Sequence, residues 1–483
     1  MNTSPFFSRR AALKSLSSGF GYVAFSALAT QAAAAEAKTS PGESDSPLAP
    51  KAPHFTPKAK RVIFLCMRGG PSHVDTFDYK PKLVADTGKA AQGNRIRAGA
   101  KLLGSKWDFR RSGKSGLRIS ELFSEVSKHA DDLCIVNGMH TDLPNHPQAF
   151  VQMHTGNFQF VRPSMGAWTL YGLGTENENL PGFITINPPS AVGGSQNYGS
   201  AFLPAAYQAT KIDTGNASRR RALAQRFNRG QNQPAPPAIP NLKNGRLSKR
   251  LQRTQLDLIK SLNLEKLNRD QVHPEVEGVI ESYELAFRMQ DAVPTVMDVG
   301  SEPESVKKLY GIGEGQTDSF GRQCLLARRF AEAGVRFIEV THGNWDQHRN
   351  LETALENNCT QTDKPIAGLL ADLKQRDLLK DTLVIWAGEF GRTPHAQNGD
   401  GRDHNNNGYS LWMAGGGIKG GMNYGMTDEY GYEAVHDKVH IHDWHATILH
   451  QLGLDHERLT YNYAGRDFRL TDVHGNVLKD IIA

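Results

Sequence analysis

The stretch RVIFLCMRGGPSHVDTFD, residues 61–78, joins a short apolar run to a segment rich in glycine, histidine, serine and aspartate. The apolar part, 61–67, is bounded by a glycine pair, which is typical of a buried strand that ends in a turn. The same transition recurs where VRFIEV (335–340) leads into THGNWDQH (341–348) and where TLVIWAG (382–388) leads into EFGRTPH (389–395). Strands that are apolar throughout, with no alternation, are typical of a parallel sheet covered on both faces.

The order of these runs predicts the fold class. Strands are expected at 61–67, 133–136, 183–186, 335–340, 382–387 and 410–414, and helices at about 118–129, 147–155, 319–333 and 364–377. This alternation predicts an α/β fold with a doubly wound, mostly parallel sheet. Residues 212–310 interrupt the pattern with helical periodicity, so we expect a helical insertion there, either a cap beside the functional site or a peripheral packing element.

The first residues are expected to be a targeting signal and not part of the fold. SRRAALK (8–14) has an arginine pair ahead of a weakly apolar stretch, and small residues suited to cleavage follow at 31–35. We therefore predict a twin-arginine signal peptide over 1–35, recognised by the twin-arginine translocase, with a periplasmic or otherwise exported mature protein. The stretch is too weakly apolar for a stable membrane anchor after cleavage. Residues 36–58, rich in Pro, Ser and Lys, predict a disordered linker ahead of one domain over 59–483.

Charge and cysteine content exclude several classes. The formal charge of +6 includes Arg9, Arg10 and Lys14 of the signal, so +3 remains on the mature chain and gives no argument for nucleic-acid binding. Four cysteines in 483 residues do not make a disulfide scaffold. Cys66 and Cys134 fall inside strand-like runs, where a small core residue is expected. The chain has no glycine-rich nucleotide motif, so a nucleotide cofactor is not expected.

The polar segments after the strands hold candidate metal ligands. Ligands of open α/β sheets bind at the carboxyl ends of the strands, so these segments are expected to meet at one edge. Asp346 and His348 are two residues apart and would point to the same side of an extended chain. Mixed carboxylate and imidazole donors are typical of a divalent-metal hydrolase. The candidate ligands are Ser72, Asp75, Asp346, His348, Glu389, Asp403 and His404.

Each of these motifs also has a structural interpretation. Asp346 and His348 could be a turn residue and a surface histidine, and the asparagine-rich loop after His404 could be a simple turn. Glu389 and Arg392 could form a structural ion pair. The alternative for Arg392 is to bind a phosphate or sulfate ester with its guanidinium.

The segment NHPQAFVQMHTG, residues 145–156, is the most diagnostic one. Asn145 can cap a helix that has Pro147 in its first turn. His146 would then lie at the positive end of that helix, where an oxyanion is favoured.

Taken together, RGGPSHVDTFD, NHPQAFVQMHTG, NWDQH, TLVIWAGEFGRTP and GRDHNNNGYSLWMAGGG resemble, in this order, a family of exported bacterial proteins. That family is catalogued as domain of unknown function 1501 and is often labelled sulfatase-like. The resemblance covers roughly residues 58–480. It implies the fold of the alkaline phosphatase and sulfatase superfamily, with a mononuclear or binuclear metal site.

The resemblance also suggests roles for single residues. Residues 145–156 resemble the sulfatase signature in spacing, and His146 falls where that signature has its modified cysteine, so the formylglycine nucleophile is absent. Asp346 and His348 resemble a metal-binding pair of the superfamily, and His404 resembles its late metal-binding histidine. Glu389 resembles an aspartate of an Asp-His-Gly motif whose histidine is replaced by Phe390. The aspartate expected after the first strand has no clean match, and Ser72 or Asp75 would serve.

These observations imply a metal-dependent hydrolase acting on phosphate or sulfate esters, including esters on a small molecule or a polysaccharide. The metal would be Zn, Ca, Mg or Mn, with His146 or metal-activated water as the nucleophile and Arg392 binding the anion. The alternative is a non-catalytic protein that keeps the fold and binds a glycan or a protein partner.

Export can be tested directly. Changing both Arg9 and Arg10 to lysine should leave uncleaved precursor in the cytoplasm, because the twin-arginine translocase reads the arginine pair. Immunoblots of the periplasmic and cytoplasmic fractions measure this, with Lys14→Arg as the matched control. Normal export of the double variant would contradict the assignment.

Overall fold

A nine-stranded sheet runs through the centre of the molecule. The computed structural model describes residues 46–91, 99–214, 239, 242, 247–270 and 274–483, so the predicted signal peptide over 1–35 lies outside the described residues. The strand order is β12-β4-β11-β8-β1-β7-β5-β6, with β15 also paired to β4. The strands are β1 (Arg61–Met67), β4 (Leu133–His140), β5 (Phe183–Ile186), β6 (Thr210–Ile212), β7 (Phe337–His342), β8 (Thr382–Ala387), β11 (Tyr409–Ala414), β12 (Met422–Tyr424) and β15 (Val439–His440).

Strand direction decides which segments meet. β1 pairs in parallel with both β7 and β8, and β5 pairs in parallel with β7. β11 alone runs against its two neighbours, β4 and β8. The amino end of β11 therefore lies at the same edge of the sheet as the carboxyl ends of β1, β4, β7 and β8. The segments that follow these four strands, and the one that precedes β11, come together at this edge.

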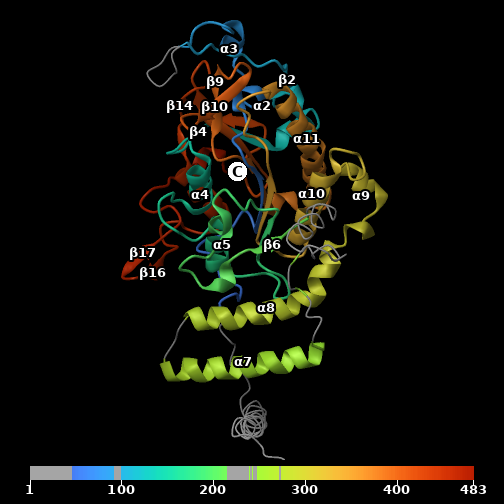
Figure 1. Ribbon diagram of the computed structural model, residues 1–483, viewed down its shortest axis with the longest axis vertical. Helices are drawn as coiled ribbons and strands as arrows, with labels where there is room; N and C mark the ends of the chain where they lie inside the picture. Colours follow the sequence, from blue (N-terminus) through green and yellow to red (C-terminus); the bar gives the residue numbers. More distant parts are fainter. Residues whose placement is uncertain (1–45, 92–98, 215–238, 240–241, 243–246, 271–273) are drawn as a thin grey trace, which may run out of the picture.

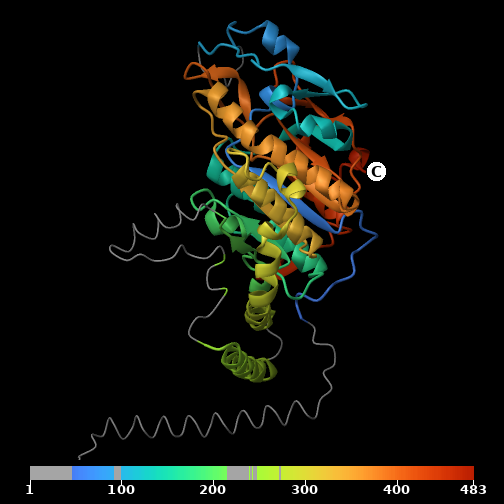
Figure 2. The ribbon, with the colours of Figure 1, turned by 90° about the vertical axis from the view of Figure 1, so that its right-hand side faces the viewer.

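Helices cover both faces of the sheet, as Figures 1 and 2 show. On one side lie α10 (Asp318–Glu332) and α11 (Leu351–Gln375), and on the other lie α4 (His146–Thr155), α5 (Met165–Leu173) and α12 (Ile441–Gln451). Every residue of β1 is buried, because the strand is central and covered on both faces. The fold class predicted from the sequence, an α/β fold with a doubly wound and mostly parallel sheet, is thus confirmed.

The short elements lie around this frame. They include the helices α2 (His73–Thr76), α3 (Pro81–Ala85) and α9 (Glu304–Leu309). Four two-stranded sheets are formed by β2 (Phe109–Ser112) with β3 (Leu117–Ser120), β9 (Gly391–Gln397) with β10 (Gly401–Asn405), β13 (Met426–Thr427) with β14 (Ala434–His436), and β16 (Tyr461–Tyr463) with β17 (Arg466–Phe468). Among the described residues, no helix is long and apolar enough to cross a bilayer.

Two predicted helices differ from the structure. The segment expected to be helical at 118–129 contains β3 and two 3₁₀ turns, because tertiary contacts override its local pattern. The Asp363 carboxylate of α11 accepts hydrogen bonds from the backbone N–H groups of Glu125 and Val126, which fixes the turn there. The helix expected at 364–377 begins earlier, at Leu351, and passes through Pro365.

The polar segment before the domain is partly attached to it. Of the linker expected over 36–58, residues 36–45 lie outside the described residues. The remainder packs on the domain: Leu48 is buried, and the backbone N–H groups of His54 and Lys58 donate to the carbonyls of Gly453 and Gln451. The structure therefore places 46–58 against the domain, where Pro and Lys content alone indicated a disordered chain.

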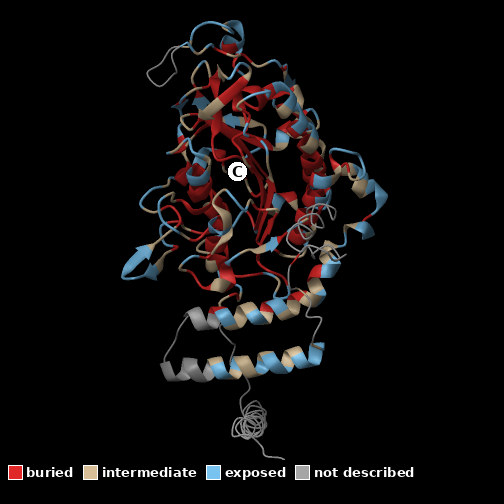
Figure 3. Cartoon of the chain, viewed as in Figure 1, coloured by how far each residue is buried: buried red, intermediate tan, exposed pale blue. Residues whose placement is uncertain are grey.

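The helical insertion lies away from the polar edge of the sheet. Its described part contains α7 (Lys249–Asp270) and α8 (Pro274–Met297), which pack side by side at the end of the molecule opposite β9 and β10. α8 contacts α10 and the turn at Ala205–Tyr207, whereas the described residues of α7 are exposed or intermediate in burial, as Figure 3 shows. Of the two interpretations of 212–310, the described residues fit the peripheral packing element.

The β9–β10 hairpin is fixed to the segment after β1 by a buried ion pair. The Arg402 guanidinium donates to both oxygens of the Asp75 carboxylate, with N–O distances of 2.7 and 3.0 Å, and both side chains are almost fully buried. The Ser72 hydroxyl donates to the same carboxylate at 2.5 Å. The carboxylate is thereby fully engaged by its own neighbours, and it holds the hairpin over the sheet edge.

Removing this carboxylate's charge should destabilise the protein. Asp75→Asn leaves the Arg402 guanidinium buried without a counter-charge, which typically costs about 3–5 kcal/mol. Urea denaturation followed by tryptophan fluorescence measures the effect. The matched control is Lys82→Gln, which breaks the exposed ion pair with Glu429 and should leave the denaturation midpoint close to that of the wild type. An unchanged midpoint for Asp75→Asn would contradict this role.

Candidate metal centre

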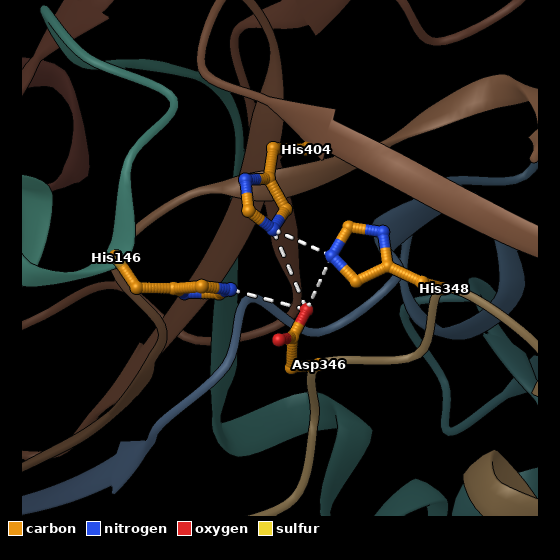
Figure 4. A group of neighbouring side chains, drawn as sticks. All are labelled: His146, Asp346, His348 and His404. Carbon is orange, nitrogen blue, oxygen red and sulfur yellow. Dashed lines mark hydrogen bonds and ion pairs between the residues drawn. The ribbon is translucent and has the colours of Figure 1, made fainter.

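Four side chains converge at the polar edge of the sheet. Asp346 and His348 lie in the loop after β7, His146 is the first residue of α4, which follows β4, and His404 lies in β10 ahead of β11. Figure 4 shows the three imidazoles directed at the Asp346 carboxylate. One ligand atom of each residue lies within 4.8 Å of the others. We call this group the rim cluster.

The imidazoles all present the same nitrogen to the carboxylate. The Nε2 atoms of His348, His146 and His404 lie 2.9, 3.1 and 3.4 Å from Asp346 Oδ1. The Nε2 atoms of His348 and His404 are 2.9 Å apart. Two imidazole nitrogens at this distance need a proton or a metal ion between them, because their lone pairs would otherwise repel.

The opposite nitrogen of each ring is held by an oxygen. His146 Nδ1 lies 2.6 Å from Glu389 Oε1, and His404 Nδ1 lies 2.7 Å from the carbonyl oxygen of Pro144. His348 Nδ1 contacts Oε1 of Gln397. An oxygen acceptor at Nδ1 places the ring proton there and leaves the Nε2 lone pair free, which is the arrangement that metal-binding histidines use. Apart from its 3.1 Å contact with Asp346 Oδ1, His146 Nε2 is buried without a hydrogen-bond partner, as expected of a ligand atom.

The spacing of the donors fits a metal ion. Tetrahedral bonds of about 2.0–2.1 Å place neighbouring ligand atoms about 3.3 Å apart. The separations between Asp346 Oδ1 and the three nitrogens, 2.9–3.4 Å, bracket this value. The Asp346 side chain is 44% exposed, so the rim cluster is open to solvent on one side.

Arg392 anchors the carboxylate. Its guanidinium, which is fully buried, donates to Asp346 Oδ1 at 2.7 Å, to the Gly70 carbonyl at 2.9 Å and also to the Gly69 carbonyl. Burial tends to raise the pKa of Asp346, but His146, His404 and Arg392 outweigh it and hold that pKa well below its usual range. The expected contact between Arg392 and a solvent-borne ester does not fit this position, because the guanidinium faces the protein interior.

Glu389 supports the rim cluster from behind. Its buried carboxylate accepts the Gly69 backbone N–H at 3.0 and 3.1 Å and holds His146 Nδ1. Gly69 has a φ of +121°, and a Cβ there would lie 2.5 Å from the backbone nitrogen of Asp346. The close packing of these two loops therefore requires glycine, which lets the segment after β1 approach Asp346.

The other predicted ligands lie outside the rim cluster. Asp75 is bound to Arg402, and Ser72 donates to Asp75. Asp403 accepts the His404 backbone N–H, and its Oδ1 is 3.9 Å from His348 Nδ1, so it lies on the side of the ring away from Asp346. The structure thus brings together Asp346, His348 and His404 from the predicted ligands and adds His146. It places Glu389 behind His146 and leaves Ser72, Asp75 and Asp403 elsewhere.

Two supporting groups were not found from the sequence. Gln397 orients His348 from β9, and the Pro144 carbonyl orients His404 from the loop before α4. A glutamine and a backbone carbonyl carry no sequence signal for a metal site. In the structure, His404 pairs with Arg392 across the β9–β10 hairpin, and this pairing brings residues of β9 to the same site.

The fold and the site together define an α/β protein with a candidate mononuclear metal centre at the carboxyl edge of its sheet. The chain belongs to the family described as protein of unknown function (DUF1501), which matches residues 59–482. Among curated proteins, none matches the sequence.

Several solved structures are similar at low sequence identity. The phosphonate monoester hydrolase SpPMH from Silicibacter pomeroyi is 11% identical, with a TM-score of 0.34 over 88% of this chain and 76% of that one. The PsFucS1 sulfatase from Pseudoalteromonas sp. is 12% identical, with a TM-score of 0.33 over 83% and 68%. The alkaline phosphatase from the Antarctic bacterium TAB5 is 10% identical, with a TM-score of 0.31 over 76% and 95%.

The charge on His146 should make the metal-free protein sensitive to pH. Burial tends to lower the pKa of His146, but the Asp346 and Glu389 carboxylates outweigh it and raise that pKa from 6.5 to about 9. A raised pKa stabilises the folded state fully below pH 6.5, and this contribution is lost as the pH rises through about 9. The urea midpoint of chelator-treated protein should therefore fall between pH 6.5 and 9.

The variant His146→Gln isolates this effect, because the fall in its urea midpoint between pH 6.5 and 9 should be much smaller than in the wild type. Exposed His436→Gln is the matched control and should keep the wild-type profile. A His146→Gln profile identical to that of the wild type would show that His146 does not carry the pH dependence.

Proposed function

We propose that this protein is a metal-dependent hydrolase of phosphate or sulfate esters, with one metal ion held by His146, Asp346, His348 and His404. One observation carries the metal assignment: three Nε2 atoms and one carboxylate oxygen converge, while oxygen acceptors hold the opposite ring nitrogens. The strand-end position of the site and the family's sulfatase-like motifs support the ester hydrolase assignment.

The donor set favours a transition metal. Imidazole nitrogens suit Zn²⁺ and related ions, whereas Ca²⁺ and Mg²⁺ prefer oxygen ligands. Three imidazoles and one carboxylate therefore narrow the four metals expected from the sequence to zinc, with manganese as the second choice. A bound metal ion would polarise an ester oxygen and lower the pKa of a water molecule to about 7.

The side chains of the site have distinct roles in this proposal. His146 is a ligand, because its Nε2 faces Asp346 and Glu389 fixes its ring. Arg392 is a positioning residue that neutralises and orients Asp346. The first turn of α4 presents its positive end beside the site, which favours a bound anion. The half-exposed side of Asp346 is where the substrate would approach.

Non-catalytic binding is the second candidate function. His146 and Arg392, the two side chains expected to act on the ester, are both engaged by other residues of the site. A protein that uses the metal to bind an anionic ester or a glycan, without cleaving it, would keep this arrangement. Turnover separates the two candidates, because a binding protein releases no phosphate or sulfate.

We also propose that the protein works after export, in the periplasm. The arginine pair and the cleavage-site residues within 1–35 support this placement. The substrate would then be an ester outside the cytoplasm, on a small molecule or a polysaccharide.

Single substitutions in the rim cluster test the metal and the activity together. Asp346→Ala, His404→Ala and His146→Ala should each lower metal affinity at least tenfold, because each leaves only three protein ligands. Metal content after dialysis and hydrolysis of aryl phosphate and aryl sulfate esters are the measurements. We expect metal and turnover to fall together in all three variants.

Asp403→Ala is the matched control, since Asp403 is half-exposed and near the rings but outside the rim cluster. It should keep its metal. Loss of turnover in His146→Ala with metal content intact would assign His146 as the nucleophile instead of a ligand. Full metal content in all three rim variants would reject the site, and absence of turnover in a metal-loaded wild type would favour the binding protein.

A further inference from the structure

A second group of metal-binding side chains lies within the core. Cys66 of β1, His154 of α4 and Glu339 of β7 are all buried, and their ligand atoms lie within 4.8 Å of one another. None of them belongs to the rim cluster. We call this group the core cluster.

The imidazole of the core cluster is oriented like those of the rim cluster. His154 Nδ1 lies 2.7 Å from the Phe150 carbonyl oxygen one turn earlier in α4, so the ring proton is on Nδ1. His154 Nε2 then faces Glu339 Oε2 at 3.4 Å. Apart from this contact with each other, both atoms are buried without a hydrogen-bond partner, whereas the other Glu339 oxygen accepts the Thr341 hydroxyl at 3.1 Å.

Burial of these groups needs a compensating cation. A buried carboxylate is costly unless it is paired and hydrogen-bonded. A proton on His154 would supply one positive charge, with the Cys66 thiol then only a small core group. A divalent ion would bind the thiolate, the carboxylate and the neutral imidazole at once, and the sum of their charges would be zero, which suits an interior of low dielectric.

We propose that Cys66, His154 and Glu339 form a second, structural metal site that takes Zn²⁺ or another thiophilic divalent ion. Sulfur, imidazole and carboxylate are the ligands that zinc takes in proteins. Thr185 is the register partner of Glu339 on the neighbouring strand, and its buried hydroxyl has no hydrogen-bond partner, so it can complete the set of donors as the fourth. A closed set of protein ligands is the mark of a structural site.

The core cluster is connected to the rim cluster through α4. His146 begins this helix and His154 lies in its last turn. A metal ion bound by His154, Cys66 and Glu339 ties α4 to the two central strands β1 and β7. The core metal thereby fixes the helix that carries His146 to the rim, whatever reaction the rim cluster performs.

Cobalt substitution distinguishes the two sites, because only the core cluster contains sulfur. The protein is produced in zinc-depleted medium supplemented with Co²⁺, so that the buried site is filled during folding. A cobalt–thiolate bond gives charge-transfer absorption in the near ultraviolet, and imidazole and carboxylate ligands do not. The wild type should contain two cobalt ions per chain and show this absorption.

The variants assign the absorption to one cysteine. Cys66→Ser should lose the near-ultraviolet band and one of the two cobalt ions. The matched control is Cys134→Ser, a change at another buried cysteine in a strand, which should keep the band and both cobalt ions. His154→Gln should also reduce the cobalt content to one ion per chain. This variant replaces Cys66→Ser as the test if Cys66→Ser does not fold. Asp346→Ala should lose the rim ion but keep the band.

The result for the wild type decides the proposal even if no variant folds. A wild type with a single cobalt ion and no thiolate band would show that the core cluster is only a buried His–Glu ion pair, and the inference would be wrong. A band that persists in Cys66→Ser would also overturn it. A single ion with the thiolate band would reject the rim centre and support the core site, so the two assignments fail separately.

Discussion

The buried guanidinium of Arg392 is the constraint on which the rest of the site depends. It donates to the backbone carbonyls of Gly69 and Gly70 after β1, to that of Arg402 in β10, and to the Asp346 carboxylate after β7. Hydrogen bonds to a charged group stabilise a protein by about 1.5–3 kcal/mol each. One side chain thus ties three segments, distant in the sequence, to a single position, and Asp346 can serve as the centre of the rim cluster only because it is held there.

The β9–β10 hairpin extends this arrangement. Arg392 and His404 face each other across the hairpin, and Arg402 binds Asp75 beneath it. The hairpin therefore brings His404 to the rim from one strand and Gln397, which orients His348, from the other. A short two-stranded element outside the main sheet completes a site whose other members follow the strands of that sheet. Arg392 and Arg402, two charged groups of the hairpin, form buried ion pairs with Asp346 and Asp75. For this reason, neither Arg392 nor Asp75 is free to bind a ligand.

The rim cluster and the core cluster, the two proposed metal sites, differ in their exposure and therefore in what they can do. The rim cluster is open on the Asp346 side, as an ester-binding site requires, whereas every member of the core cluster is buried. The helix α4 joins them, with His146 at its start and His154 near its end. A rigid helix between an open and a closed site allows the closed site to fix the geometry of the open one, since catalytic geometry depends on the groups that support the ligands.

The sequence by itself determined six of the nine strands of the main sheet, the class of the fold and most members of the rim cluster, because apolar runs that end in glycine and charged residues have one stable placement in a buried parallel sheet. It did not determine roles. His146 was expected as one of two candidate nucleophiles and Arg392 as an anion binder, and the tertiary structure placed His146 beside the Asp346 carboxylate in the rim cluster and Arg392 behind it. Gln397, the Pro144 carbonyl and the trio of Cys66, His154 and Glu339 carry no local signal. Their functions arise from distances between segments, which the tertiary structure alone decides, because burial and the direction of each side chain set which atoms face one another.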